Sequence, residues 1–214
     1  MIVYSMQGDF LSECTYLIVD GDKALVVDPG TSAERIFSEC EKLGVKPIAV
    51  LLTHGHADHT IGAPELQRMG CKVYAHREEY SVIEGRASLS IALGISRTVF
   101  VPDVPLADGD VIDLEPFSIK VIYTPGHTQG GVCYLVKDAL FTGDTLFPGS
   151  YGRIDFPTGD EQDLINSICN ELFELPKETK VYSGHGDASR EAAPTAPQTT
   201  IGNEYSTNPI LYLL

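Results

Sequence analysis

Residues 53–59 read THGHADH, and this heptapeptide constrains the fold of the 214-residue chain more than any other stretch. It holds three of the six histidines and one aspartate. The apolar segment Ile48–Leu52 precedes it, so a buried strand should end where the motif begins. One compact turn thus offers two pairs of candidate ligands: His54 with His56, and Asp58 with His59. Imidazole together with carboxylate suits zinc, iron or manganese better than calcium or magnesium.

The other candidate ligands also follow β-type segments. His127 lies in TPGHTQGG, Asp144 in FTGDTLF and His185 in YSGHGD. Glycine flanks each of them and lets the backbone turn tightly, so that the side chain projects from the edge of a sheet. Five of the six histidines are therefore expected at one rim. The sixth, His76, stands alone in YAHREE and is expected to be structural.

Ten segments rich in β-branched and aromatic residues are expected to be strands. They are Ile2–Ser5, Thr15–Val19, Ala24–Val27, Ile48–Leu52, Lys72–Tyr74, Thr98–Val101, Ile119–Tyr123, Val132–Val136, Ala139–Phe141 and Lys180–Tyr182. Apolar residues at helical spacing predict helices at Thr31–Leu43, Gly62–Met69 and Asp160–Phe173. The first of these begins with a capping box of Thr31 and Glu34. Residues 77–95 are expected to be helical and to cover the site as a lid.

Two stretches resemble each other: TYLIVDGDKALVVDPG at 15–30 and CYLVKDALFTGDT at 133–145. Both read as a hairpin that runs into an aspartate. Each half of the chain is therefore expected to form a strand-rich layer with helices outside. No long low-complexity linker divides the sequence, and its length suits one core. We expect a single α/β domain over residues 1–214.

The composition limits the partners that this chain is expected to have. Its formal net charge is −15, and no run is rich in Lys or Arg. Nucleic-acid binding needs clustered basic residues, so no nucleic-acid partner is expected. No apolar run of about 18 residues occurs, so no membrane span is expected. The five cysteines are dispersed without a CxxC pair, which favours buried thiols in a cytoplasmic protein.

The motifs VVDPG (26–30), THGHADH, TPGHTQGG, FTGDTLF and SGHG (183–186) resemble, in order and spacing, those of the metallo-β-lactamase superfamily. The resemblance covers nearly the whole chain and implies a four-layer αβ/βα sandwich with a dinuclear site at one edge. Two divalent ions are implied, zinc first, with iron or manganese as alternatives. The implied ligand sets are His54, His56 and His127 for one ion, and Asp58, His59 and His185 for the other. Asp144 would bridge the ions.

Two roles are expected for Asp28 in VVDPG. The resemblance implies that it orients ligands through hydrogen bonds. An aspartate in a turn after a strand is otherwise ordinary turn chemistry.

Differences from the residues typical of individual branches indicate which branch of the superfamily this chain resembles. The best-known penicillin-destroying enzymes carry cysteine where this chain has Asp144, which argues against β-lactam hydrolysis. The segments at 141–160 and 199–211 are similar to the small bacterial glyoxalase II-like group. Larger glyoxalase II enzymes add a helical region that binds glutathione, whereas 29 residues follow His185 here. They also carry Lys and Tyr at the positions of Arg153 and Asp155. Arg153 is expected either to hold a substrate carboxylate or to pair with a nearby aspartate.

The resemblance implies a metal-dependent thioester hydrolase for S-lactoylglutathione or a related acyl-thiol, with Asp58 accepting a proton from water. Two alternatives stay open. A mononuclear iron persulfide dioxygenase would share both the HxHxDH run and a stretch like GRID (152–155), and would bind one iron through His54, His127 and Asp144. The other alternative is a lactonase. A non-enzymatic metal-binding or sulfur-sensing module fits the intact ligand set least well.

Overall fold

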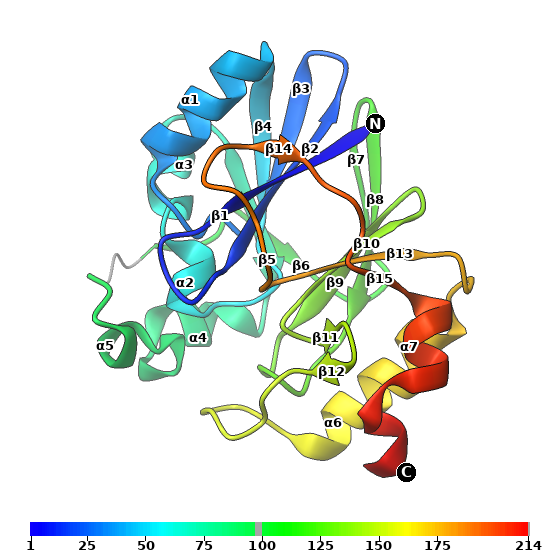
Figure 1. Ribbon diagram of the computed structural model, residues 1–214. Coiled ribbons are helices and arrows are strands. Elements are labelled where there is room, and N and C mark those ends of the chain that lie inside the picture. Colours follow the sequence, from blue (N-terminus) through cyan, green and yellow to red (C-terminus); the bar gives the residue numbers. More distant parts are fainter. Residues whose placement is uncertain (97–99, 214) are drawn as a thin grey trace.

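The computed structural model describes residues 1–96 and 100–213 of the chain. Two β-sheets pack face to face, and helices cover the outer face of each sheet (Figure 1). The layers are α1 and α3, a seven-stranded sheet, a six-stranded sheet, and α6 with α7. This arrangement confirms the four-layer sandwich that the sequence motifs implied.

The first sheet has the strand order β14-β1-β2-β3-β4-β5-β6. Its strands are β1 (Ile2–Gln7), β2 (Cys14–Asp20), β3 (Lys23–Val27), β4 (Lys46–Leu51), β5 (Lys72–His76), β6 (Val104–Leu106) and β14 (Ala193–Pro194). The strands β1, β2 and β3 are antiparallel neighbours, whereas β4, β5 and β6 run parallel to β3. Helices α1 (Ala33–Leu43) and α3 (Ala63–Arg68) lie in the crossovers that parallel pairing requires.

The second sheet has the strand order β15-β13-β10-β9-β8-β7. Its strands are β7 (Val111–Leu114), β8 (Phe117–Tyr123), β9 (Val132–Val136), β10 (Ala139–Gly143), β13 (Lys180–Ser183) and β15 (Thr199–Thr200). An antiparallel hairpin of β9 and β10 is followed by the parallel strand β13. The first sheet has the same arrangement in β2, β3 and β4, which confirms the hairpin read from the repeated sequence in each half.

The remaining elements are short. They are α2 (Ala57–Thr60), α4 (Glu79–Glu84), α5 (Ser90–Leu93), α6 (Glu161–Asn166), α7 (Ile201–Thr207), the 3₁₀ turns Arg86–Ser88, Leu172–Glu174 and Pro209–Leu213, the π turn Ser167–Glu171, and a small hairpin of β11 (Leu146–Phe147) and β12 (Ser150–Tyr151). Residues 77–95 are largely helical, as expected. No helix in the described parts of the chain is long and apolar enough to cross a membrane.

Aromatic residues join the two sheets near the rim that carries the candidate ligands. Tyr16 packs edge-on against Phe141 and Tyr182. The Tyr16 hydroxyl donates a hydrogen bond of 2.7 Å to the Ser183 carbonyl in the opposite sheet. The Tyr134 hydroxyl donates one of the same length to the Leu52 carbonyl. These bonds hold the sheets in register where the functional loops begin, because a buried hydroxyl needs its partner.

Two sequence expectations were wrong in detail. Ser32, not Thr31, caps α1, because the Ser32 hydroxyl accepts from the Arg35 amide, whereas the Thr31 hydroxyl donates to Asp9. The strand expected at Thr98–Val101 falls partly on residues 97–99, which lie outside the described residues. Phe100 and Val101 are not in a strand, and β6 forms that edge of the sheet instead.

The helix expected at Asp160–Phe173 begins as predicted, since the Asp160 carboxylate accepts from the Asp163 amide at 2.9 Å. It then widens into the π turn and ends in a 3₁₀ turn. The sequence reading missed β7 and α7. Four of the five cysteines are buried, as expected.

Of the glycines in the loop after β8, Gly126 should be the least tolerant of a larger residue. Its φ is +129°, and a Cβ there would lie 2.3 Å from the Leu164 amide nitrogen. Gly44 also has a positive φ, +69°, but no atom would contact its Cβ. We expect Gly44→Ala to cost about 1 kcal/mol of unfolding free energy. Gly126→Ala should cost about 3 kcal/mol, because overpacking adds to the backbone strain. Urea unfolding of both variants measures the difference, and equal losses would contradict the packing.

Candidate metal site

The carboxyl ends of five strands meet at one rim of the sandwich and bring the predicted residues together. Asp28 follows β3, the THGHADH residues follow β4, and His127, Asp144 and His185 follow β8, β10 and β13. These strands belong to both sheets, so the cluster lies across the gap between them. His76 at the end of β5 is not part of it. Its ring stacks on Tyr123, with ring centroids 4.5 Å apart, in keeping with the structural role expected for it.

One group at the rim consists of His54, His56 and His127. All three are buried, and one nitrogen from each lies within 4.8 Å of the others. His56 Nδ1 is 3.0 Å from His127 Nε2. Two imidazole nitrogens at this distance need either a proton or a metal ion between them, because two lone pairs repel.

A second group consists of Asp58, His59 and His185, whose ligand atoms also lie within 4.8 Å of one another. His59 Nε2 is 3.1 Å from His185 Nε2. The Asp58 carboxylate lies 3.8 Å from His59 Nε2 and 3.7 Å from His185 Nε2. The two groups are the same two sets that the sequence motifs implied.

Asp144 lies between the two groups. Its Oδ2 atom is 3.5 Å from His127 Nε2 and 3.2 Å from His185 Nε2. Its Oδ1 atom is 3.5 Å from His59 Nε2. One carboxylate thus faces nitrogens of both groups, which is the position that a bridging ligand needs.

Asp28 and Thr53 fix the orientation of two rings. The Asp28 carboxylate accepts from His59 Nδ1 at 3.1 Å, from the Thr53 amide at 2.7 Å and from the Thr53 hydroxyl at 2.6 Å. Because this hydroxyl donates to Asp28, it accepts from His54 Nδ1 at 3.0 Å. The protonated nitrogens therefore point away from the rim, and each Nε2 points into the cluster. Asp28 thus lies where it can orient a ligand, which is one of the two roles expected for it. Thr53 was not expected to take part.

Backbone carbonyls orient the other two rings in the same way. His127 Nδ1 donates to the Arg153 carbonyl at 2.7 Å, and His185 Nδ1 donates to the Leu11 carbonyl at 2.9 Å. Both Nε2 atoms are then acceptors directed into the cluster. No sequence signal could indicate these partners, since every residue carries a carbonyl.

The cluster fits divalent cations. His54 Nε2 and Asp144 Oδ1 are buried and have no hydrogen-bond partner among the described residues. A buried acceptor without a partner costs roughly 1–3 kcal/mol. A cation coordinated by these atoms would remove that cost, and imidazole with carboxylate is the donor set that zinc, iron and manganese accept.

The pKa values at the rim depend on burial and on the nearby carboxylates. Burial lowers the pKa of His54, His56 and His127 below the usual range. Burial also acts to lower the pKa of His59, but the attraction of Asp144 and Asp58 outweighs it and raises that pKa. The two carboxylates therefore favour positive charge at this point of the rim.

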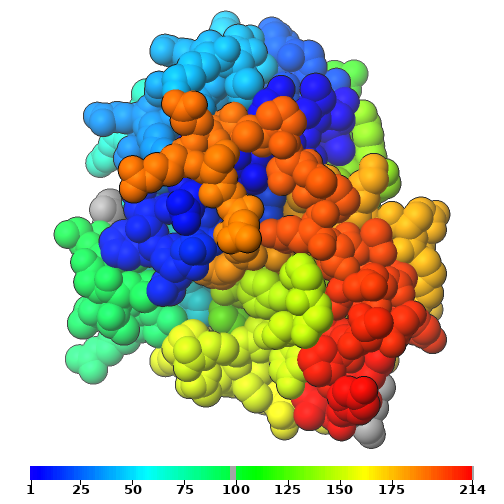
Figure 2. Space-filling view, viewed as in Figure 1, coloured from blue at the N-terminus to red at the C-terminus, as the bar shows by residue number. Residues whose placement is uncertain are grey.

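A pocket of about 340 Å³ opens onto the cluster. Its floor is formed by His56, Asp58, His127, Asp144 and His185, and its walls by Leu11, Leu89, Leu93, Phe147, Ser150, Tyr151, Arg153 and Phe156. Leu89 and Leu93 belong to the segment that was expected to act as a lid, and they form one wall. Figure 2 shows the loops at the blue, yellow-green and orange positions of the colour bar meeting on one face of the molecule.

Arg153 lies at the edge of this pocket, and its guanidinium is already paired. Nε and one terminal nitrogen donate to the two carboxylate oxygens of Asp155 at 2.8 and 2.6 Å. The guanidinium also lies over the Phe156 ring, 4.2 Å from its centroid. The pairing with Asp155 is one of the two roles expected for Arg153, and a contact with substrate stays a prediction.

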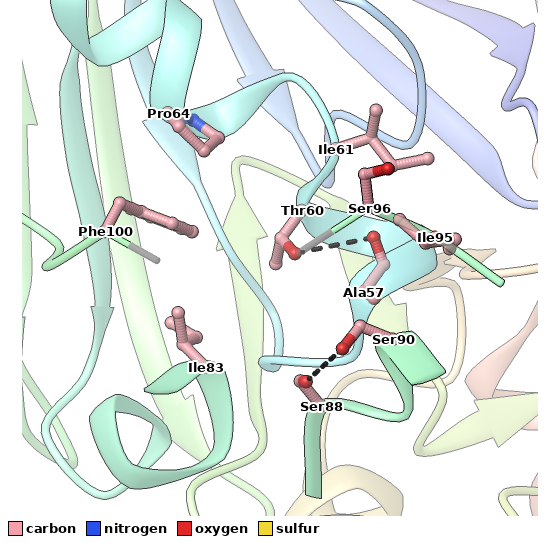
Figure 3. Close-up of a pocket in the computed structure, with 10 residues that line it drawn as sticks. All are labelled: Ala57, Thr60, Ile61, Pro64, Ile83, Ser88, Ser90, Ile95, Ser96 and Phe100. Atoms are coloured by element: carbon pink, nitrogen blue, oxygen red, sulfur yellow. Dashed lines mark hydrogen bonds between the residues drawn. The ribbon is translucent and has the colours of Figure 1, made fainter. Parts of the chain in front are cut away.

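A second, smaller cavity of about 160 Å³ lies behind α2 (Figure 3). Ala57, Thr60 and Ile61 line it from one face of the helix, while Asp58 and His59 belong to the opposite face. Ile83, Ser88 and Ser90 line it from the lid segment. The cavity is therefore separate from the candidate metal site.

Glu79 is a buried residue near the site that the sequence reading missed. Its carboxylate accepts from the Gly55 amide at 2.5 Å and from the Gly130 amide at 2.8 Å. Burial raises its pKa to about 7. The sequence pair Glu78-Glu79 gives no sign that one of the two residues points inward.

Comparison with known proteins identifies the family. The model of the metallo-β-lactamase superfamily matches residues 8–185. The chain belongs to this superfamily. A probable metallo-hydrolase of Bacillus subtilis is 36% identical over 203 residues, covering 92% of this chain and 90% of the relative. A hydroxyacylglutathione hydrolase of Haemophilus influenzae is 34% identical over 208 residues, covering 94% and 93%. The relatives support a metal-dependent hydrolase.

Solved structures are similar over almost the full chain. The B3 metallo-β-lactamase BLEG-1 superposes with a TM-score of 0.87 at 32% identity, covering 98% of this chain and 99% of that one. The protein TTHA1623, solved in a di-iron-bound form, gives 0.80 at 33% identity, covering 96% and 98%. ETHE1 from Myxococcus xanthus gives 0.76 at 29% identity, covering 98% and 84%.

Replacing Asp28 tests the hydrogen bonds that orient the rings. Asp28→Asn turns one acceptor oxygen into a donor and leaves either His59 or Thr53 without its partner. We expect the affinity for zinc to fall by about tenfold to a hundredfold, as for other residues that orient metal ligands. Competition with a chelator measures it, and Asp22→Asn in an exposed turn is the control. Equal affinities in the two variants would contradict the orienting role.

Proposed function

We propose that this chain is a dinuclear metal-dependent thioester hydrolase of the glyoxalase II type, acting on S-lactoylglutathione or a related acyl-thiol. The observation that carries the proposal is the pair of ligand groups that share Asp144. The name of the relative from Haemophilus influenzae, hydroxyacylglutathione hydrolase, supports the reaction class. The di-iron form of TTHA1623 supports two ions per chain.

The proposed ligands of the first ion are His54, His56 and His127. Those of the second are Asp58, His59 and His185, and Asp144 would bridge the two ions. We propose zinc as the native metal, with iron or manganese as alternatives that accept the same donor set. Bound divalent ions would lower the pKa of water, so that hydroxide is available near neutral pH, and would polarise a carbonyl oxygen.

The pocket floor, the pocket walls and Asp58 would then have separate roles in hydrolysis. The pocket floor holds the thioester carbonyl next to the cluster, and the apolar walls exclude bulk water. The carboxylate of Asp58 accepts the proton of the attacking water. When the carbon–sulfur bond breaks, the thiolate leaves, and Asp58 returns the proton to it. The step needs no serine or cysteine nucleophile.

An iron persulfide dioxygenase is the second candidate. Of the stretch 152–155, which suggested it, Arg153 lies at the pocket edge and pairs with Asp155. That reaction would use one iron at His54, His127 and Asp144 and would consume oxygen. Because such dioxygenases also carry the HxHxDH run, the ligand residues do not separate the two candidates, and the metal content and the oxygen dependence do.

Anaerobic hydrolysis of S-lactoylglutathione by the metal-loaded protein tests the proposal. We expect turnover without oxygen and a fall in kcat of about a hundredfold or more in Asp58→Asn, which loses the proton acceptor. The control is Asp113→Asn, an exposed position on β7. A β-lactam belongs in the same assay because of the similarity to BLEG-1. The proposal fails if the loaded protein cleaves no thioester, or if Asp58→Asn is as fast as the control.

A further inference from the structure

The walls of the pocket above the candidate metal site are apolar. Six apolar or aromatic side chains form most of their surface: Leu11, Leu89, Leu93, Phe147, Tyr151 and Phe156. Ser150 and Arg153 complete the walls. Arg153 is the one lysine or arginine among the described residues that line the pocket. Two nitrogens of its guanidinium already donate to the Asp155 carboxylate. A charged substrate group inside the pocket would lose its hydration without a free partner, which is costly.

The size and chemistry of the pocket suit a short acyl chain. Its volume of about 340 Å³ is at the lower end of the range that is typical for small-molecule sites. A glutathione moiety carries two carboxylates and an ammonium group, whereas the one basic side chain of the described lining, Arg153, is already paired with Asp155. A short hydrocarbon chain needs no charged partner.

We propose that this pocket selects thioesters whose acyl group is a short apolar chain, while the thiol part extends into solvent. The inference rests on the proposed thioester hydrolysis and narrows its substrate class. The acyl chain lies between Leu93 of the lid and Phe156 of the opposite loop. The carbonyl carbon lies at the floor next to Asp58, and hydrolysis releases a fatty acid and a free thiol.

Rates with matched thioesters test this selection. Acetyl, butanoyl and hexanoyl thioesters of N-acetylcysteamine and of glutathione are compared with S-lactoylglutathione on the metal-loaded protein. We expect kcat/KM to rise about fourfold for each methylene that the walls cover. The hexanoyl thioester of glutathione should exceed S-lactoylglutathione. A flat or falling series, or a preference for the lactoyl group, overturns the inference while leaving thioester hydrolysis in place.

Two variants in α5 test whether the pocket wall causes the preference for longer acyl chains. Leu93→Asn places an amide in the wall and should reduce the hexanoyl-to-acetyl ratio about fivefold or more. Ile91→Asn in the same helix is the control, because Ile91 is exposed and does not line the pocket. A non-hydrolysable hexyl thioether of N-acetylcysteamine, measured by calorimetry against the methyl thioether, gives a readout without turnover. If the hexyl compound binds no more tightly, the inference is wrong even when no thioester is cleaved.

A different observation points to a second inference, at Glu79. This residue begins α4, is fully buried, and binds two backbone amides through its two carboxylate oxygens. One amide belongs to Gly55, between His54 and His56. The other belongs to Gly130, in the loop that carries His127. One carboxylate thus joins the two loops that supply the first ligand group.

The surroundings of Glu79 leave little freedom. A Cβ at Gly55 would lie 2.9 Å from the Glu79 carboxylate, and one at Gly130 would lie 2.6 Å from the Glu79 amide. The Gln129 side chain donates to the Glu78 carbonyl and to the Ser81 hydroxyl. Because α4 contacts both loops this closely, the geometry assigns Glu79 as a positioning residue for the ion of His54, His56 and His127.

The test measures the affinity of each ion separately. Glu79→Gln keeps the shape of the side chain but leaves one amide unpaired. Metal is added back to the metal-free protein in competition with a chelator. The affinity for the first ion should fall about tenfold or more, and the affinity for the second should stay within twofold of the parent protein. Glu78→Gln, at the exposed neighbouring position, should leave both affinities unchanged.

A merely structural role for Glu79 predicts another pattern. Glu79→Gln would then lower the unfolding temperature of the metal-free protein, and both affinities would weaken equally or stay the same. Either pattern of affinities overturns the inference, whereas a lower unfolding temperature is expected under both roles because one buried amide loses its partner. Glu79→Asp is the second variant, because its shorter side chain cannot reach both amides and should also weaken the first ion selectively.

Discussion

The mutual repulsion of imidazole nitrogens at the rim is the constraint on which the rest of the structure depends. Two pairs of ring nitrogens lie 3.0 and 3.1 Å apart, and two carboxylates lie beside them. Such an arrangement is stable only with positive charge between the groups. The fold therefore holds side chains in place that would otherwise move apart. Asp28, Thr53 and two backbone carbonyls hold the rings from behind, and the hairpins of both sheets hold the loops.

The sequence could indicate which candidate ligands lie together because four of them are neighbours in the chain. His54, His56, Asp58 and His59 lie within six residues, so one turn had to bring them together. The other candidates each follow a β-rich run and are flanked by glycine, which placed them at strand ends. The repeated hairpin in each half correctly indicated two similar layers. The superfamily and its four-layer sandwich could be predicted from these motifs, and both are confirmed.

What the sequence did not show depends on contacts between distant segments. Glu79 has the same sequence context as Glu78, and only the packing of α4 makes it buried. The cap of α1 shifted from Thr31 to Ser32 because Asp9, far away in the chain, binds the Thr31 hydroxyl. The pocket walls come from three separate segments, around residue 11, at 89–93 and at 147–156, so no periodicity in the sequence indicates their apolar character. We infer the substrate preference from those walls and the reaction class from the motifs.

The central claim is that two metal ions, not one, occupy the rim. Elemental analysis of protein purified without added metal measures this directly, with Asp144→Ala as the companion sample. The structure predicts two divalent ions per chain, and fewer in the variant because it lacks the carboxylate between the groups. One iron per chain in the parent protein, or two ions retained in Asp144→Ala, would contradict the dinuclear site.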